Sequence, residues 1–152
     1  TARQAQVIAA WQAGRTGMPF VDANMRELRE TGYMSARGRQ NAASFFARDL
    51  GQDWRLGAAW FESQLVDYDP SSNWGNWANI AGVGTDKRDQ GFDVLWQARR
   101  YDPDGAYVAA WLPELADLSA ADRHAPFLCS ASIRARLAYP ALVVAAPEHW
   151  RC

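Results

Sequence analysis

The chain contains no run of roughly 18 consecutive apolar residues, the shortest length that reads as a membrane span. We therefore expect no transmembrane segment, and association with a membrane complex stays open. A charge excess is also absent, since 16 Lys and Arg face 17 Asp and Glu, for a net charge of −1. Arginines alternate with acids along the chain, so no basic groove is indicated and nucleic acid is not an expected partner.

Cysteine is scarce as well. Cys129 and Cys152 are the two cysteines, and their spacing matches no metal-ligand pattern. We therefore expect free thiols in a reducing compartment and no metal site.

Tryptophan is abundant by comparison, with 8 in 152 residues, and 49% of the chain is hydrophobic. That is enough apolar material for one domain with a real core. So many indoles either fill a large helical core or serve electron transfer, and the count alone does not choose between these roles.

The apolar residues recur with a helical period, and no alternating strand pattern occurs, so the predicted class is all-α. Expected helix starts are Pro19 and the caps Ser35, Asp53 and Asp69, and Gly14 and Gly32 are expected stops. The expected helices cover residues 3–13, 19–31, 36–50, 54–65, 70–81, 92–100, 106–115 and one turn at 119–123. Three prolines after residue 124 disfavour a long helix, so we expect a helical core at 1–124 and an irregular tail at 125–152, with a helical turn or two at 133–137.

One stretch, Leu65 to Trp77, concentrates the polar chemistry. Asp69 is expected to cap a helix that begins at Pro70, and Asn73 and Trp77 share a face of it at i, i+4. With Asp67 nearby, the set could hold a flat, polar heterocycle beside a redox-active ring. The alternative is a capped helix with an ordinary amphipathic face, and spacing alone leaves both open.

The sequence L-V-D-Y-D-P-S-S-N-W-G-N-W at 65–77, followed by A-G-V-G-T-D at 81–86, resembles the flavin-binding signature of the photolyase/cryptochrome family. The D-Y-D-P form and the run G-Y-M-S-A-R-G-R-Q at 32–40 look most like the DASH cryptochromes. The resemblance implies a helical bundle like the C-terminal half of the family's FAD-binding domain.

The same resemblance implies a cofactor-binding set for FAD. Asp67 and Asp69 resemble the aspartates beside the isoalloxazine and ribityl groups, and Tyr68 between them joins the set. Asn73 resembles the residue that faces the flavin N5, and Arg39 the arginine that pairs with the first aspartate. A core salt bridge between Arg39 and Asp67 is an alternative that is compatible with the flavin role.

Two indoles resemble members of the family's electron-transfer chain, Trp77 as the inner one and Trp54 as the middle one. Core packing is the alternative for each. The outer member would fall at or before Thr1, so it is expected to be absent or replaced by another residue such as Trp11.

Three departures from the family pattern lower the expectation of activity. The N-terminal antenna domain and the segment that holds the flavin phosphates have no counterpart in these 152 residues. Ala36 stands where the family usually has asparagine, and Asn79 stands where it has a substrate-stacking aromatic residue. FAD is therefore implied by the resemblance, and its loss from this chain is left open.

We therefore favour a truncated flavin domain that is retained as a non-catalytic structural or docking subunit, with other protein chains covering its open cavity face. The alternative is an FAD-dependent blue-light photoreceptor or DNA photolyase, complete by itself or with a second chain. Whether the chain is an enzyme is left open. DASH-like relatives are commonly organellar, which implies a plastid or mitochondrion.

Overall fold

The computed structural model describes residues 1–83 and 92–151, and every regular element in those ranges is a helix. This confirms the all-α class. The end of the flavin-binding signature, at 84–86, lies outside the described residues. None of the helices in the described part is long and apolar enough to cross a bilayer.

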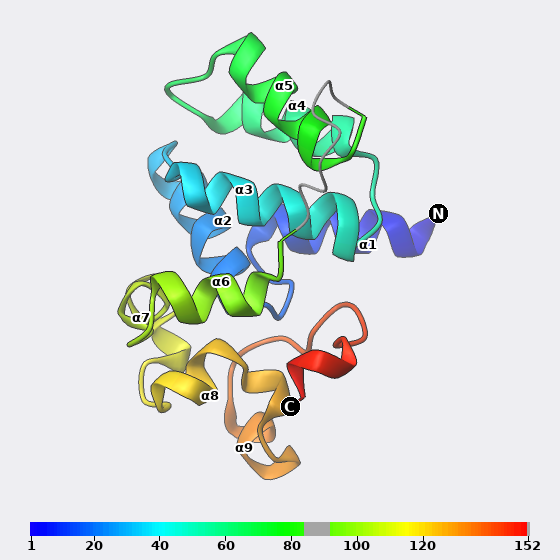
Figure 1. Ribbon diagram of the computed structural model, residues 1–152. Helices are drawn as coiled ribbons and strands as arrows, with labels where there is room; N and C mark the ends of the chain where they lie inside the picture. Colours follow the sequence, from blue (N-terminus) through cyan, green and yellow to red (C-terminus); the bar gives the residue numbers. More distant parts are fainter. Residues whose placement is uncertain (84–91, 152) are drawn as a thin grey trace.

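The helices form three levels around α2 (Figure 1). The middle level holds α1, α2 and α3, and α2 packs against α1, α3 and α7. A hairpin of α4 and α5 lies on one side of this level, and the remaining helices lie on the other side. The bounds are α1 Ala2–Ala13, α2 Pro19–Thr31, α3 Ala36–Ser44, α4 Trp54–Gln64, α5 Pro70–Ile80, α6 Val94–Tyr101, α7 Ala106–Trp111, α8 Ala120–His124 and α9 Ala131–Arg136.

Most helix ends lie where side-chain chemistry predicts them. The side chains of Ser35, Asp53 and Asp69 each accept a hydrogen bond from a backbone N–H in the first turn of the following helix. Gly14 and Gly32 end α1 and α2 in the left-handed conformation. The structure confirms these caps. They could be predicted because each depends on residues within a few positions of one another.

Two expected helices end early. The third helix is α-helical only to Ser44 and continues as a turn of π-helix, η1, over Phe45–Asp49, with the Leu50 N–H bonded to the Phe45 carbonyl. The helix expected to reach residue 115 stops at Trp111, because Leu112 precedes a proline and leaves the helical region. A 3₁₀ turn, η2, then covers Pro113–Leu115.

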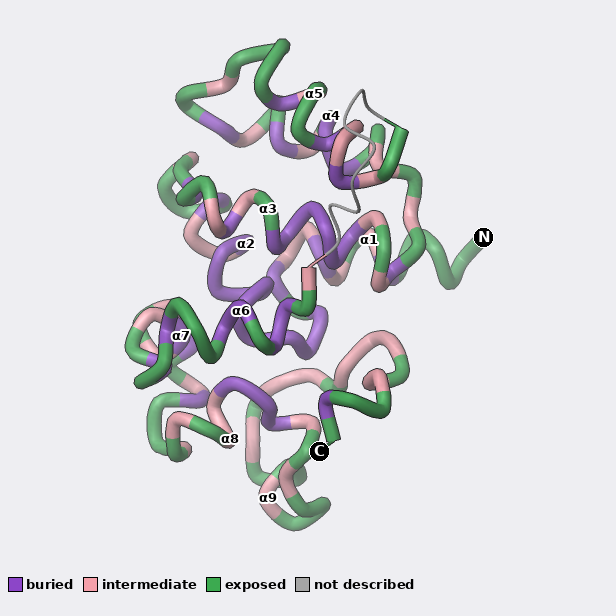
Figure 2. The backbone as a smooth tube through the Cα atoms, in the orientation of Figure 1, coloured by how far each residue is buried: buried purple, intermediate pink, exposed green. Residues whose placement is uncertain are grey.

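An aromatic cluster fills the space between the middle level and the α4–α5 hairpin. Ring centroids of Trp77 lie 5.0 Å from Phe61, 5.8 Å from Phe46 and 5.9 Å from Trp11. Trp11 and Trp77 are both buried, and the buried stretches gather along α2, α3 and the inner side of the hairpin (Figure 2). Core packing thus accounts for these two indoles at least in part.

The segment expected to be irregular, 125–152, contains α9 and the 3₁₀ turns η3 (Pro126–Leu128) and η4 (Glu148–Trp150). This segment is attached to the turn between α1 and α2 through a buried carboxylate on α2. Asp22 accepts hydrogen bonds from the Thr16 hydroxyl (2.6 Å), from the Thr16 and Gly17 N–H groups and from the Tyr139 hydroxyl. The boundary at residue 124 itself stays a prediction.

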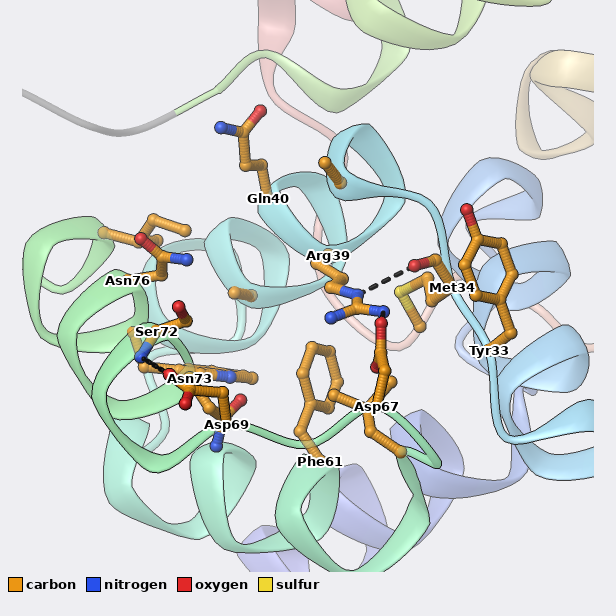
Figure 3. Close-up of a pocket in the computed structure, with 15 residues that line it drawn as sticks. Tyr33, Met34, Arg39, Gln40, Phe61, Asp67, Asp69, Ser72, Asn73 and Asn76 are labelled. Atoms are coloured by element: carbon orange, nitrogen blue, oxygen red, sulfur yellow. Dashed lines mark hydrogen bonds and ion pairs between the residues drawn. The ribbon is translucent and has the colours of Figure 1, made fainter.

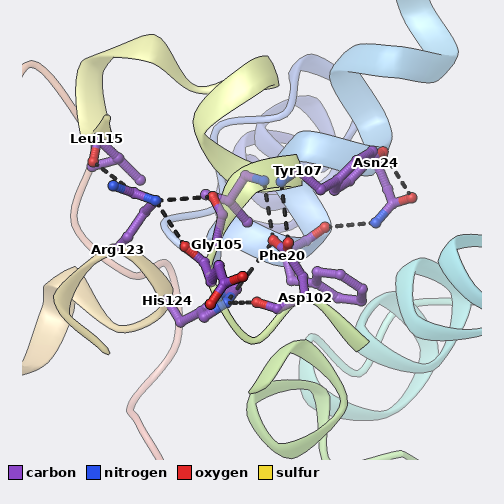
Figure 4. Close-up of polar contacts among 10 residues, drawn as sticks. Phe20, Asn24, Asp102, Gly105, Tyr107, Leu115, Arg123 and His124 are labelled. Carbon is purple, nitrogen blue, oxygen red and sulfur yellow. Dashed lines mark hydrogen bonds and ion pairs between the residues drawn. The ribbon is translucent and has the colours of Figure 1, made fainter. Parts of the chain in front are cut away.

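A second polar network joins α7 and α8 (Figure 4). Arg123 donates hydrogen bonds to five backbone carbonyls, among them those of Leu115 and Gly105. Asp102 accepts from the N–H groups of Tyr107 and Val108 and so caps α7. These bonds give the short helices an ordered arrangement that their length alone does not provide.

Candidate functional site

A pocket of about 440 Å³ lies between α3 and the α4–α5 hairpin (Figure 3). Its volume falls within the range of roughly 300–1,000 Å³ that is usual for small-molecule sites. The lining combines a polar edge with an apolar interior. It consists of Tyr33, Met34, Ala36, Arg39, Gln40, Ala43, Phe61, Leu65, Asp67, Asp69, Ser72, Asn73, Asn76, Trp77 and Ile80.

An ion pair between Arg39 and Asp67 forms part of the polar edge. Arg39 Nη2 lies 2.9 Å from both carboxylate oxygens of Asp67, and its Nε donates to the Met34 carbonyl at 2.7 Å. Their side chains are 29% and 52% exposed, so the pair is open to solvent on one side. The N–H of Val66 also bonds to the Gly32 carbonyl, which holds the loop of Asp67 beside the α2–α3 turn.

The start of α5 supplies the next two polar residues. Asp69 Oδ2 caps the helix by accepting from the Ser72 N–H at 2.8 Å. Asn73 is buried, and its Nδ2 donates to the Ala58 carbonyl at 3.0 Å, which fixes α5 against α4. Because the amide donor is used in this way, the carbonyl Oδ1 of Asn73 is the atom that can accept a hydrogen bond from a ligand.

The interior of the pocket is apolar and includes the indole of Trp77. That side chain is buried, and its Nε1–H has no hydrogen-bond partner among the described residues. Buried polar atoms without a partner are rare in proteins, and this indole is held instead by the rings of Phe61, Phe46 and Trp11 around it.

Five of the seven predicted site residues therefore line one pocket, namely Arg39, Asp67, Asp69, Asn73 and Trp77. Tyr68 and Trp54 do not line it. The Tyr68 hydroxyl donates to Glu62 Oε1 and accepts from Trp74 Nε1 at 3.1 Å, and the Trp54 ring lies 5.8 Å from that of Trp74. The direct role of Tyr68 in cofactor binding stays a prediction, with these neighbours now known.

Trp11 does not suit the position of an outer electron carrier. It is 0% exposed, and its Nε1 donates to the Ala42 carbonyl at 3.2 Å. An outer carrier must exchange electrons at the surface, so Trp11 belongs to the core around Trp77.

The sequence interpretation missed several polar residues that line the pocket, among them Tyr33, Gln40 and Asn76. Helical spacing could have found Asn76, which lies three residues after Asn73 on α5. Of the two substituted positions among the three departures, Ala36 lines the pocket and Asn79 does not.

The lining suits a flat aromatic heterocycle better than a polyphosphate. Arg39 is the one cation among the described residues that line the pocket, and Asp67 and Asp69 supply two carboxylates. A heterocycle can place one hydrogen-bonding edge on these groups and its faces against the apolar interior. Phosphates, which are usually held by cations or clustered N–H groups, find no such set here.

A family model described as the FAD binding domain of DNA photolyase matches residues 1–151. The chain is 61% identical to Cryptochrome DASH of Natronomonas pharaonis over 128 residues, which are 84% of this chain and 27% of that protein. It is 58% identical to "Cryptochrome DASH, chloroplastic/mitochondrial" of Solanum lycopersicum over 118 residues, which are 77% of this chain and 20% of that protein.

A crystal structure of a cryptochrome from Synechocystis sp. PCC6803 shares the arrangement of the helices. The TM-score is 0.86 at 50% identity, over 91% of this chain and 30% of that one. The chain therefore spans less than a third of the length of each of these relatives.

Proposed function

Given that this chain belongs to the photolyase/cryptochrome family, as a part of the FAD-binding domain, we propose that it forms one wall of a flavin site. The observation that carries the proposal is the convergence of Arg39, Asp67, Asp69, Asn73 and Trp77, from three segments of the chain, on a single pocket.

The residues of the pocket fit the isoalloxazine part of FAD. Arg39 and Asp67 offer a donor and an acceptor side by side, as the edge of a flavin ring requires, and the guanidinium can stabilise negative charge on a reduced ring. Asn73 Oδ1 can accept from a protonated ring nitrogen. When bound, the flavin supplies one-electron redox chemistry, and these residues hold and orient its ring.

The diphosphate of FAD needs contacts that the pocket does not offer, since Arg39 is already paired with Asp67. We therefore propose that polypeptide beyond these 152 residues, in the same protein or in a second chain, holds the phosphates and covers the open side. The finer activity we propose is light-driven, as a photoreceptor or a DNA photolyase. Ala36, which cannot hydrogen-bond through its side chain, favours the photoreceptor.

A second candidate is a cofactor-free structural or docking subunit whose pocket face is covered by other protein chains. It is favoured by the way in which the polar groups satisfy one another: Arg39 with Asp67, Asp69 with Ser72, and Asn73 with Ala58. A pocket held together in this way does not need a cofactor to keep its shape.

For location, we propose an organelle, plastid or mitochondrion. The Solanum lycopersicum relative is named as chloroplastic/mitochondrial, whereas the names of the other two relatives give no organelle.

The deciding experiment is a flavin-binding assay on Asp67→Asn with Asp53→Asn as its matched control. Asp53 also pairs with an arginine and caps a helix, but it does not line the pocket. Both variants should stay folded, because exposed ion pairs contribute roughly 0–1 kcal/mol.

We expect a yellow wild-type protein whose Kd for FAD rises about tenfold or more in Asp67→Asn, since a hydrogen bond to a charged group is worth roughly 1.5–3 kcal/mol. Asp53→Asn should bind as the wild type does. A colourless protein that takes up no FAD, with or without the rest of the domain added, would contradict the flavin role and favour the docking subunit.

A further inference from the structure

We propose that Tyr68 is the outward electron donor of this site and that Glu62 receives its phenolic proton. The inference rests on the proposed flavin function, and it assigns a new role to a side chain that lies outside the pocket.

Tyr68 lies between a carboxylate and an indole. Its hydroxyl donates to Glu62 Oε1, near the end of α4, and accepts from Trp74 Nε1 at 3.1 Å, in the second turn of α5. Trp74 Nε1 also lies 3.4 Å from the same carboxylate oxygen. One oxygen of Glu62 thus contacts both aromatic side chains, and the Tyr68 proton already points at an acceptor.

Helix α5 carries both Trp74 and Trp77, which relates this group to the pocket. Trp77 lines the pocket, and Trp74 lies three residues earlier on α5, where Cβ atoms are about 5–6 Å apart. The Trp77 ring also rests on α4 at Gly57, one turn after Trp54. The rings of Trp54 and Trp74 are 5.8 Å apart, so Trp54 lies beside the indole that contacts Tyr68.

The step is a proton-coupled electron transfer. A flavin held by the proposed site would supply the one-electron oxidant when excited by light; Trp77 would lose an electron to it and regain one from Trp74. The Trp74 radical cation takes one electron from Tyr68 while the phenolic O–H bond breaks and an O–H bond forms on Glu62. The products are a neutral indole, a neutral tyrosyl radical and a neutral carboxylic acid, so one electron and one proton are accounted for.

The hydrogen bond to Glu62, with burial as a lesser cause, raises the pKa of Tyr68 above its ordinary value. The phenol is therefore protonated at neutral pH, and its oxidation must release a proton as well as an electron. A carboxylate within hydrogen-bonding distance is the group that can take it.

The other tyrosines lack this combination of neighbours. Tyr33 and Tyr101 lie beside the guanidinium groups of arginines, at 5.9 and 4.1 Å. The hydroxyls of Tyr107 and Tyr139 contact carboxylates, Glu27 and Asp22 respectively, and no indole contact is recorded for them in the described part of the chain.

The test detects the radical itself by electron paramagnetic resonance and transient absorption, in the wild type and in Tyr68→Phe, Glu62→Gln and the control Tyr101→Phe, which lies outside the pocket. One arm uses the protein with FAD under blue light. The other uses the protein without flavin and generates tryptophan radicals with a ruthenium polypyridyl photo-oxidant and a sacrificial acceptor.

We expect a tyrosyl signal in the wild type and in Tyr101→Phe, and its loss in Tyr68→Phe. In Glu62→Gln it should form about a hundredfold more slowly, the lower end of what a positioned base contributes. Trp74 should then stay oxidised for longer, which a purely structural hydrogen bond would not cause.

A tyrosyl signal that survives Tyr68→Phe in both arms overturns the inference, and so does a wild type with tryptophan radicals but no tyrosyl radical. If the flavin-free arm gives a Tyr68 radical while FAD does not bind, the donor assignment stands and the flavin function fails. If FAD binds and is photoreduced without a Tyr68 radical, the flavin function stands and the donor assignment fails.

Discussion

Gly57 and Trp77 are in direct contact: a Cβ placed on Gly57 would lie 2.2 Å from Cη2 of the indole. Both residues are buried, and the contact brings α4 against α5 at the side of the pocket. The glycine is needed there for its lack of a side chain, since any larger residue would have to displace the ring.

We expect Gly57→Ala to lower the free energy of unfolding by about 1–3 kcal/mol, the usual cost of overpacking a core. Urea denaturation measures this, and FAD affinity should fall in parallel as Trp77 moves. The matched control is Gly75→Ala on α5, where a new Cβ meets nothing within 4 Å. That variant should gain about 0.5–1 kcal/mol, and a loss of similar size in both would refute the steric explanation.

Asp49 should make stability depend on pH. Burial, with the nearby charge of Asp93 as the second cause, raises its pKa from 3.8 to about 6. Between pH 3.8 and about 6, the folded state therefore keeps a proton that the unfolded chain has lost. The stabilisation that comes from this bound proton is present at pH 4 and is lost as the pH rises through 6.

Asp49→Asn should remove this dependence, so that the variant becomes progressively more stable relative to the wild type from pH 4 to pH 7. Urea midpoints across that range check it. Asp104→Asn, at an exposed position, should follow the wild-type curve. Parallel curves for wild type and Asp49→Asn would show that Asp49 titrates normally.

Tyr139→Phe should detach the C-terminal segment from the α1–α2 turn. It removes one of four donors to the buried Asp22 carboxylate and should cost about 1–3 kcal/mol. Limited proteolysis should then cut residues 140–151 more readily. Tyr33→Phe, whose side chain is exposed, should change stability by less than about 0.5 kcal/mol, and equal proteolysis of the two variants would argue against the attachment.

Arg123→Lys should destabilise the α7–α8 region although the charge is kept. A guanidinium reaches five carbonyls at once, whereas an ammonium on a flexible stem cannot. We expect a loss of about 1.5–3 kcal/mol in thermal or urea unfolding. Arg29→Lys, on the exposed side of α2, is the control. If Arg123→Lys unfolds at the same midpoint as the wild type, the planar guanidinium geometry is not needed there.

The sequence could predict the structural features that depend on residues close to one another in the chain. The caps Ser35, Asp53 and Asp69 and the stops Gly14 and Gly32 follow from local hydrogen bonding and backbone preference. The pairing of Arg39 with Asp67, 28 residues apart, came from the family resemblance and not from spacing.

Other features could not be predicted because distant packing decides them. The π-helical turn at Phe45 depends on how its aromatic side chains fit the core. Tyr68 turns away from the pocket while Asp67 and Asp69 on either side line it, and the order of residues in a loop does not reveal such a reversal. The contact of Asp22 with Tyr139 joins positions 117 residues apart.

The packing of Trp11 against Trp77 has a consequence for spectroscopy. The indole that lines the pocket is backed by a residue of the first helix, 5.9 Å away. The absorption spectrum of a chromophore in contact with Trp77 would therefore depend on how α1 packs. Substitutions in α1 would shift an absorption band although that helix does not contact the chromophore.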